Sequence, residues 1–154
     1  MTIKVDREAI WLDFPGSTRE EIIQGICLKL RELGKTADAE SLLGDVMHRE
    51  ELVSTFAGHG TAIPHVVTKH ICAPVLCFVR AADPDLTWHG SSESVVFVAF
   101  CAVPENEGTS AIRADQSRIF SALAHLIRTP VVTDRWKATS DAAVIQEDLN
   151  QALI

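Results

Sequence analysis

Two short runs of apolar residues constrain the fold of this chain more than any other feature. Residues 75–80 and 94–103 are rich in Val and Phe, and proline or polar residues bound each run. Runs of this length and composition are typical of strands that are buried on both faces of a sheet. We therefore predict a central β-sheet with a covering layer on each side.

Helical patterns in the N-terminal third predict part of that covering. Between Thr18 and Gly34, apolar residues recur at helical spacing, Thr18 and Glu21 form a capping box, and Gly34 provides a C-terminal stop. A second amphipathic pattern begins near Asp38 and runs to Arg49. We predict two helices here, the second of which carries Arg49 at its far end.

The C-terminal third predicts the rest of the covering. After a polar loop at 105–110, apolar residues recur helically from a start near 115–117, and Ser140 with Asp141 forms a cap for a last helix. No linker, repeat or low-complexity segment divides the chain. The predicted fold class is therefore α/β, with a mixed central sheet flanked by helices in one domain over residues 1–154.

Composition excludes several classes of function. The chain has 154 residues, of which 47% are hydrophobic, and this suits one sizeable core. Fourteen Lys and Arg against 21 Asp and Glu give a net charge of −7, without a basic run that would track nucleic-acid phosphates. No apolar stretch approaches the roughly 20 residues of a membrane span, and the N-terminal residues lack signal-peptide features. We expect a cytoplasmic protein that binds no nucleic acid and does not insert into a membrane.

Cofactor and metal motifs are absent as well. The sequence contains no GxxxxGK[ST], GxGxxG, GxSxG or HExxH pattern. The four cysteines stand among apolar neighbours, as is usual for reduced buried thiols, and the spacing of Cys72 and Cys77 is not that of a zinc knuckle. We expect neither a metal nor an organic cofactor.

A histidine cluster is the remaining candidate for chemistry. His59, His65 and His70 fall within twelve residues, and His65 follows Pro64 where a short apolar strand meets a polar loop. A neutral imidazole is a competent nucleophile toward a phosphoryl group, and a guanidinium such as that of Arg49 can neutralise the developing charge. From spacing alone, an exposed histidine without a function and a metal ligand are the open alternatives.

The segment from Arg49 to His65 resembles a family motif. In the fructose/mannitol-type A components (EIIA) of the sugar phosphotransferase system, Arg-Glu is followed by Ser-Thr-Gly, a Gly-x-Gly turn and Ala-Ile-Pro-His. The order of the predicted elements also follows that family over nearly the whole chain. The positions that match are Arg49, Glu50, Ser54, Thr55, Gly58, Gly60, Ala62, Ile63, Pro64 and His65.

This resemblance implies a fold and a function. The implied fold is a mannitol-type EIIA-like sandwich, in which His65 would accept a phosphoryl group from the phosphohistidine of a small, HPr-like phosphocarrier protein. His65 then passes the group to a cysteine of the EIIB component, so that a carbohydrate enters the cell as a phosphate ester. Arg49 would pair with the phosphoryl oxygens. Their orientation would fall to the hydroxyls and backbone amides of Ser54, Thr55, Gly58 and Gly60.

The chain departs from the family motif at several positions. Many relatives have glycine where Phe56 stands and asparagine where His59 stands, so His59 either tunes the pKa of His65 or fills the turn. Many also carry a second active-site histidine where this chain offers Asp115 or Gln116. A glutamine there can donate its amide N–H to a phosphoryl oxygen.

The missing second histidine points to one branch of the family. Galactitol-type A components similarly lack it, and another histidine follows their Ile-Pro-His by five residues, as His70 follows His65 here. We therefore expect a galactitol-like branch. The resemblance leaves the carbohydrate and the oligomeric state open.

Two further functions compete with transport. Similar domains act in nitrogen-linked regulatory chains, where phosphorylation changes partner binding, and a domain without its second histidine can also be a degenerate binding module. In either transport or regulation, a carrier needs a small, transient docking surface with an apolar centre. We expect Phe56, Val66 and Val67, which flank His65, to form it.

Overall fold

A computed structural model describes residues 4–105 and 109–154, with the side chains of 109–113 and 115 outside the description. Within this part of the chain a mixed, six-stranded sheet lies at the centre, in the order β1-β5-β6-β3-β2. β4 pairs with the same side of β6 as β3, further along that strand. The strands are β1 (Ile10–Phe14), β2 (Phe56–Gly58), β3 (Thr61–Ala62), β4 (His65–Thr68), β5 (Val75–Ala81) and β6 (Phe97–Pro104).

The central strand β6 is buried on both faces, as the sequence predicts. All eight of its residues are buried. Val98 and Phe100 belong to the hydrophobic cluster on one face of the sheet, and Phe97 and Ala99 belong to the cluster on the other face. Because successive side chains of a strand point to opposite faces, one apolar strand serves two cores.

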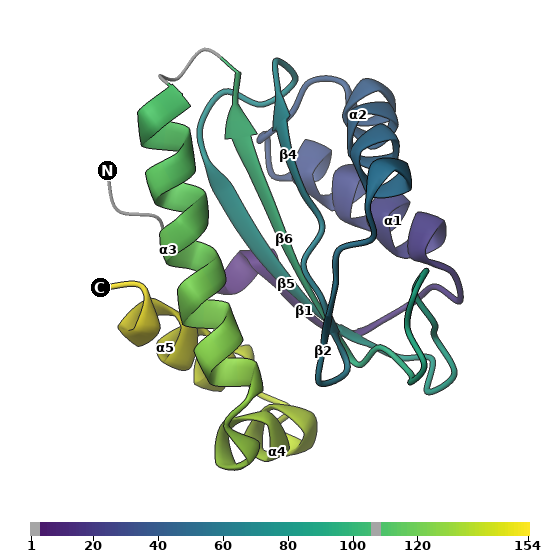
Figure 1. Cartoon of the computed structure of the whole chain (residues 1–154), viewed down its shortest axis with the longest axis vertical. Coiled ribbons are helices and arrows are strands. Elements are labelled where there is room, and N and C mark those ends of the chain that lie inside the picture. Colours follow the sequence, from purple (N-terminus) through teal and green to yellow (C-terminus); the bar gives the residue numbers. More distant parts are fainter. Residues whose placement is uncertain (1–3, 106–108) are drawn as a thin grey trace.

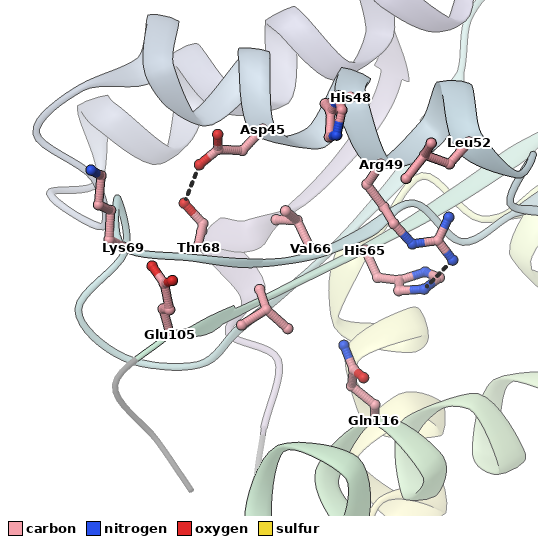
Figure 2. A pocket seen from close by; sticks show the side chains of 11 residues that line it. Asp45, His48, Arg49, Leu52, His65, Val66, Thr68, Lys69, Glu105 and Gln116 are labelled. Atoms are coloured by element: carbon pink, nitrogen blue, oxygen red, sulfur yellow. Dashed lines mark hydrogen bonds between the residues drawn. The ribbon is translucent and has the colours of Figure 1, made fainter. Parts of the chain in front are cut away.

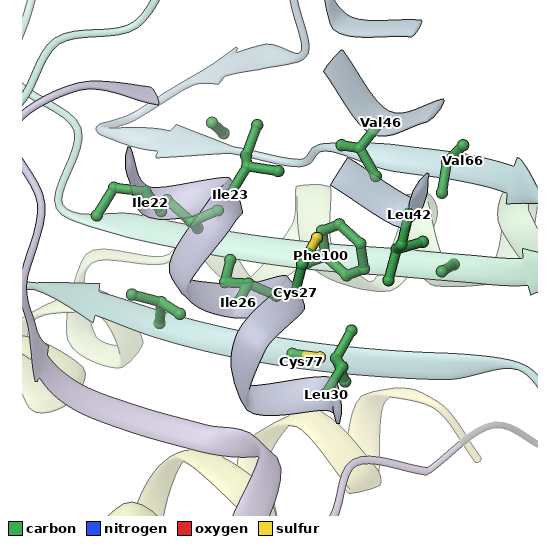
Figure 3. Close-up of a cluster of buried hydrophobic side chains, with 14 of the residues drawn as sticks. Ile22, Ile23, Ile26, Cys27, Leu30, Leu42, Val46, Val66, Cys77 and Phe100 are labelled. Atoms are coloured by element: carbon green, nitrogen blue, oxygen red, sulfur yellow. The ribbon is translucent and has the colours of Figure 1, made fainter. Parts of the chain in front are cut away.

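Helices cover both faces of the sheet (Figure 1). On one side, Ile26 and Leu42 pack against Phe100 of the sheet (Figure 3). On the other side, Ile119 and Trp136 belong to the second cluster. The α/β sandwich is therefore confirmed. The first layer contains α1 (Arg19–Glu32) and α2 (Ala39–Leu52); the second contains α3 (Thr109–Ile127), α4 (Pro130–Ala138) and α5 (Ala142–Ala152).

The caps predicted at Thr18 and Asp141 are present, and Asp38, near which the second helix was expected to begin, caps that helix. Thr18 Oγ1 accepts a hydrogen bond of 3.1 Å from the backbone N–H of Glu21, and an Asp38 carboxylate oxygen accepts one of 3.0 Å from Ser41 N–H. Asp141 caps α5 in the same way, through a bond of 2.9 Å from Ala143 N–H. These side chains replace the hydrogen-bond partners that the first turn of a helix lacks.

Other boundaries differ from the prediction. The helix expected to begin near residue 115 begins at Thr109, and residues 106–108 of the expected 105–110 loop lie outside the described residues. A short 3-10 turn, η1 (Arg7–Ala9), precedes the edge strand β1, which the sequence did not predict. The helix α4 was also missed, although Pro130 stands in its first turn, a place where proline is favoured.

The cysteines follow the prediction with one exception. Cys27, Cys77 and Cys101 are buried, whereas Cys72 is exposed, so the prediction of four buried thiols was wrong for Cys72. Burial raises the pKa of the Cys27 thiol to about 12. That thiol therefore stays protonated and unreactive at neutral pH.

Two distant segments of the chain are tied together at one end of the fold. The backbone N–H of Val5 donates to Asn150 Oδ1 at 2.9 Å, and Asn150 Nδ2 donates back to the Val5 carbonyl at 3.1 Å. Gln146 Nε2 donates to the same carbonyl at 3.3 Å. The N-terminal segment is thus fastened to α5 by side-chain amides. Among the helices of the described chain, none is both long and apolar enough to cross a bilayer.

Candidate functional site

His65 is the first residue of β4 and directly follows Pro64. It is aligned with Cys101 of β6, and the Cys101 N–H donates to the Pro64 carbonyl at 3.0 Å. Proline fixes its own φ, the pairing of β4 with β6 fixes the residues that follow it, and a hydrogen bond from the Ile63 N–H to the Thr55 carbonyl holds the residue before it. The backbone therefore holds the half-buried imidazole in one place at the surface.

The contacts of the imidazole define its protonation. Nδ1 lies 2.9 Å from the carbonyl oxygen of Ile63, and Nε2 lies 3.0 Å from Nη2 of Arg49 (Figure 2). A carbonyl only accepts and a guanidinium only donates, so Nδ1 carries the proton and Nε2 presents its lone pair. Both contacts assign the same neutral tautomer, with Nε2 as the nucleophilic atom.

Arg49 lies in the last turn of α2, as predicted. Its Nη1 donates to the carbonyl of Val53 at 3.2 Å, just beyond the end of the helix. A cation is favoured at this end because the terminal carbonyls of a helix carry partial negative charge. The guanidinium is therefore anchored on one side while its other nitrogen contacts His65.

The pKa of the His65 imidazole lies below its ordinary value of 6.5. The main cause is burial, and the positive charge of Arg49 adds to it. The hydrogen bond to the Ile63 carbonyl and the negative charge of Glu50 act in the opposite direction. The ring is consequently neutral at pH 7, the state that a nucleophilic nitrogen requires.

An open cleft of about 710 Å³ lies in front of the imidazole. Figure 2 shows Arg49 reaching into it from α2 and Gln116 pointing toward His65 from α3. The structure thus brings Gln116 to the position that the sequence proposed for it, whereas the side chain of Asp115 lies outside the described residues. The cleft is lined by Asp45, His48, Arg49, Leu52, His65, Val66, Val67, Thr68, Lys69, Glu105 and Gln116.

Phe120, which was not predicted as a site residue, also contacts the imidazole. Its ring packs edge-on against that of His65, with 4.8 Å between the centroids and 68° between the planes. Phe120 is one helical turn beyond Gln116 on α3, so the two residues share a face. The four-residue spacing from Gln116 on a predicted helix was the sequence signal that could have identified Phe120.

The predicted hydroxyls of Ser54 and Thr55 are bonded within the protein. Ser54 Oγ donates to the His89 carbonyl, and Thr55 Oγ1 donates to Glu50 Oε2 at 2.7 Å. Neither residue is among the described residues that line the cleft. A direct role of these hydroxyls at a phosphoryl group therefore stays a prediction.

Gly58 ends β2, and His59 and Gly60 form the turn that leads to β3. Their φ angles are +82°, +53° and +66°, all in the left-handed region. Glycine adopts this region without strain, and histidine and asparagine tolerate it better than most residues do. The backbone thus explains why asparagine or histidine occupies this position, and it favours the turn-filling role of His59. The Gly60 N–H donates to a Glu93 carboxylate oxygen at 3.2 Å.

The expected docking residues need one correction. Val66 is 6% exposed and packs in the core under α2, because alternate residues of β4 face inward, while Val67 is 43% exposed. Leu52 and Val53, at the end of α2, are 67% and 65% exposed. Leu52 and Val67 line the cleft, and Val53 directly follows Leu52 in the chain. These three residues form the exposed apolar surface beside His65 that replaces the expected one, and Phe56 is partly buried.

No group of three or more His, Cys, Asp or Glu side chains in the described chain is arranged to hold a metal ion.

Solved structures share this fold. A nitrogen regulatory protein IIA-Ntr from Neisseria meningitidis superimposes with a TM-score of 0.78 at 21% identity, covering 94% of this chain and 95% of that one. The IIA mannitol structure from Escherichia coli gives a TM-score of 0.72 at 20% identity, covering 96% and 99%. At these identities, the likeness shows that the chain shares the fold of these IIA proteins, and no more.

The sequence comparisons then establish the family. Residues 4–152 match the model of the phosphoenolpyruvate-dependent sugar phosphotransferase system, EIIA 2, and the chain belongs to this family. It is 30% identical over 156 residues to the 2-O-alpha-mannosyl-D-glycerate-specific EIIABC component of Escherichia coli K12, covering 99% of this chain and 22% of that protein. It is also 33% identical over 117 residues to multiphosphoryl transfer protein 1 of the same organism, covering 76% and 13%. The chain thus spans less than a quarter of these curated relatives, and the galactitol-like branch stays a prediction.

Proposed function

We propose that the chain carries a phosphoryl group on Nε2 of His65 within a carbohydrate phosphotransferase system. The observation that carries this proposal is the pair of hydrogen bonds that leaves Nε2 unprotonated beside Arg49 at an open cleft. A neutral nitrogen suits attack on the electrophilic phosphorus atom of a phosphoryl group, and a permanent cation beside it offsets the negative charge of the phosphoryl oxygens. Membership of the EIIA family supports the same chemistry.

Each transfer exchanges one bond to phosphorus for another. The lone pair of Nε2 forms an N–P bond as the N–P bond of a donor phosphohistidine breaks, and that electron pair returns to the donor ring. The Nδ1–H bond to the Ile63 carbonyl stabilises the positive charge that the His65 ring acquires. Arg49 leaves Nε2 and pairs with the phosphoryl oxygens, for which its planar fork is well shaped.

The second transfer returns His65 to its starting state. A thiolate of an EIIB component attacks phosphorus, the N–P bond breaks, and its electron pair returns to Nε2. A similar solved structure is described as a complex of enzyme IIA mannitol with phosphorylated enzyme IIB mannitol from Escherichia coli; its TM-score is 0.71 at 22% identity, covering 95% of this chain and 96% of that one. This likeness supports an EIIB acceptor, and an HPr-like phosphocarrier is the matching donor.

A regulatory role is the second candidate, favoured by the similarity to the nitrogen regulatory IIA fold. It uses the same phosphorylated histidine but no EIIB acceptor. The two roles therefore differ in the second transfer and not in the first.

The test is reconstituted phosphotransfer followed by intact-mass measurement. With the general phosphodonor chain, the wild type should gain one phosphoryl group that is labile in acid and stable in base, and His65→Ala should gain none. Gln116→Ala should label more slowly, because it loses an amide donor that faces the site. Passage of the group to a purified EIIB component supports the transport role, whereas a group that no EIIB component accepts supports regulation. Labelling of His65→Ala contradicts the proposal and moves the chemistry to another histidine.

A further inference from the structure

Glu50 is a buried carboxylate that neighbours Arg49 in the last turn of α2. It is 1% exposed and accepts three hydrogen bonds. Its Oε1 accepts from the Thr55 N–H at 3.0 Å and from Trp88 Nε1 at 2.6 Å, and its Oε2 accepts from Thr55 Oγ1 at 2.7 Å. Nη1 of Arg19 lies 3.9 Å from Oε1. A charge is retained in such a place only when its environment compensates it, as these donors do.

These bonds continue to the imidazole. Thr55, which Glu50 holds by both its N–H and its hydroxyl, accepts a hydrogen bond of 2.9 Å from the N–H of Ile63 at its own carbonyl. The carbonyl of Ile63 in turn accepts from Nδ1 of His65 at 2.9 Å. Hydrogen bonds, joined through the backbones of Thr55 and Ile63, therefore connect the Glu50 carboxylate to the imidazole ring.

The same carboxylate fixes the other partner of the site. Arg49 is the preceding residue of α2, so fastening Glu50 to the segments that hold Thr55 and Trp88 also fixes the backbone from which the guanidinium extends. Arg19, at the start of α1, approaches from a fourth segment. The positions of Arg49 and His65 therefore both depend on the buried carboxylate of Glu50.

We propose that Glu50 is a positioning residue for phosphoryl transfer, which aligns Arg49 directly and His65 through Thr55 and Ile63. This inference rests on the proposed function of His65 as a phosphoryl carrier. The positions of Arg49 and His65 matter because a misplacement of reacting groups by about 1 Å can lower the rate of a chemical step on the order of 100-fold.

The charge of Glu50 has a second effect on the same ring. It raises the pKa of His65, against the lowering by burial and by Arg49. The residues that face the ring from α3, Gln116 and Phe120, carry no charge. Removal of the Glu50 charge should therefore lower the His65 pKa, an effect that a purely structural side chain does not have.

Two substitutions at Glu50 separate bonding from charge. In Glu50→Gln, the amide oxygen can accept both N–H bonds and the amide nitrogen can donate to Thr55 Oγ1, so the bonds survive and the charge is lost. Glu50→Ala loses both. Asp148→Asn is the matched control, because Asp148 also accepts from a tryptophan Nε1, at 2.8 Å from Trp136, and pairs with Arg135 at 2.8 Å, but on the other side of the sheet.

The experiment combines NMR titration of the unphosphorylated proteins with single-turnover phosphotransfer at saturating donor. The His65 pKa should fall in Glu50→Gln and stay unchanged in Asp148→Asn. The transfer rate should fall on the order of 100-fold in Glu50→Ala, recover most of that loss in Glu50→Gln, and stay unchanged in Asp148→Asn. The half-saturating donor concentration should stay the same in all of them, because Glu50 is buried and does not meet the partner.

Two results overturn the inference. One is a folded Glu50→Gln with the His65 pKa of the wild type; the other is a folded Glu50→Ala with the transfer rate of the wild type. If Glu50→Ala does not fold, Trp88→Phe takes its place: it keeps the charge but loses one hydrogen bond, and a wild-type rate in it overturns the positioning role. A wild type that takes up no phosphoryl group contradicts the proposed function instead, and the titration still decides whether Glu50 acts on His65.

Discussion

Nη2 of Arg49 lies 3.0 Å from Nε2 of His65, on the side of the ring where a phosphoryl group would have to bind. The guanidinium therefore occupies the approach to the nucleophile in the unphosphorylated protein. Phosphorylation must displace it, and the phosphoryl oxygens offer it stronger, charged acceptors in exchange.

The first prediction concerns the tautomer. We expect ¹⁵N NMR of the neutral His65 ring to show a protonated Nδ1 and an unprotonated Nε2, because Ile63 supplies an acceptor and Arg49 a donor. After phosphorylation, the phosphorus coupling should appear at Nε2. A phosphoryl group on Nδ1 would contradict this assignment.

The second prediction separates the charge of Arg49 from its shape. Arg49→Lys should leave the His65 pKa low, since the positive charge remains, yet slow phosphotransfer, since an ammonium cannot bind two phosphoryl oxygens as a planar fork does. Arg49→Ala should slow transfer further and raise the His65 pKa, because one of its lowering causes is gone. Equal rates in the wild type and both variants would remove Arg49 from the mechanism.

The third prediction is the pH dependence. Because the pKa of folded His65 lies below 6.5, the nucleophile stays neutral as the pH falls through 6.5, and the transfer rate should decline only at lower pH. The unfolded chain binds this proton more readily, so the contribution of His65 to stability is complete above about pH 6.5 and decreases as the pH falls toward the folded pKa. Rate–pH profiles and the NMR titration of His65 should give the same midpoint.

The fourth prediction concerns docking at the apolar surface of Leu52, Val53 and Val67. Leu52→Glu should raise the half-saturating concentration of the donor by about tenfold, equivalent to about 1.4 kcal/mol, while the rate at saturation persists. Val131→Glu is the control, because Val131 is 68% exposed on α4, in the other helical layer. Chemical-shift changes confined to that other layer on addition of the donor would show that this surface is the wrong one.

The fifth prediction tests the role of His59. With a φ of +53°, this position should accept Asn with little change in stability, whereas His59→Val should lower the free energy of unfolding by about 1 kcal/mol or more. The His65 pKa should be the same in both variants and the wild type. A shifted pKa in a stable His59→Asn variant would restore the alternative in which His59 tunes the site.

Local patterns predicted the parts of the fold that depend on local physics. The apolar runs of β5 and β6 reflect burial, and the caps at Thr18 and Asp141 reflect the unpaired amides at helix starts, so both are visible in the sequence. The prediction that His65 and Arg49 form one site is supported by the contact between them. It arose from the chemistry of the two residues, and the resemblance to the family motif set it above the alternatives that spacing left open.

The remaining features depend on contacts between distant segments. The link from Glu50 through Thr55 to Ile63 forms only when the antiparallel pairing of β2 with β3 brings Ile63 back beside Thr55. The spacing of the residues in the sequence does not indicate this contact. The sequence also did not indicate which residues of the short strand β4 face the core. Val66 points inward and Val67 outward, but two adjacent valines show no alternation of apolar and polar residues.

The hydrogen bonds between Val5 and Asn150 hold an N-terminal and a C-terminal segment of the described chain side by side. A domain whose two end segments lie close together can be inserted into a longer polypeptide, because the chain on either side of the insertion stays nearly continuous in space. Joining residues near the two ends directly and opening the chain elsewhere should then give a circular permutant that still folds. This arrangement is compatible with the finding that the chain matches only 22% and 13% of the length of two much longer relatives.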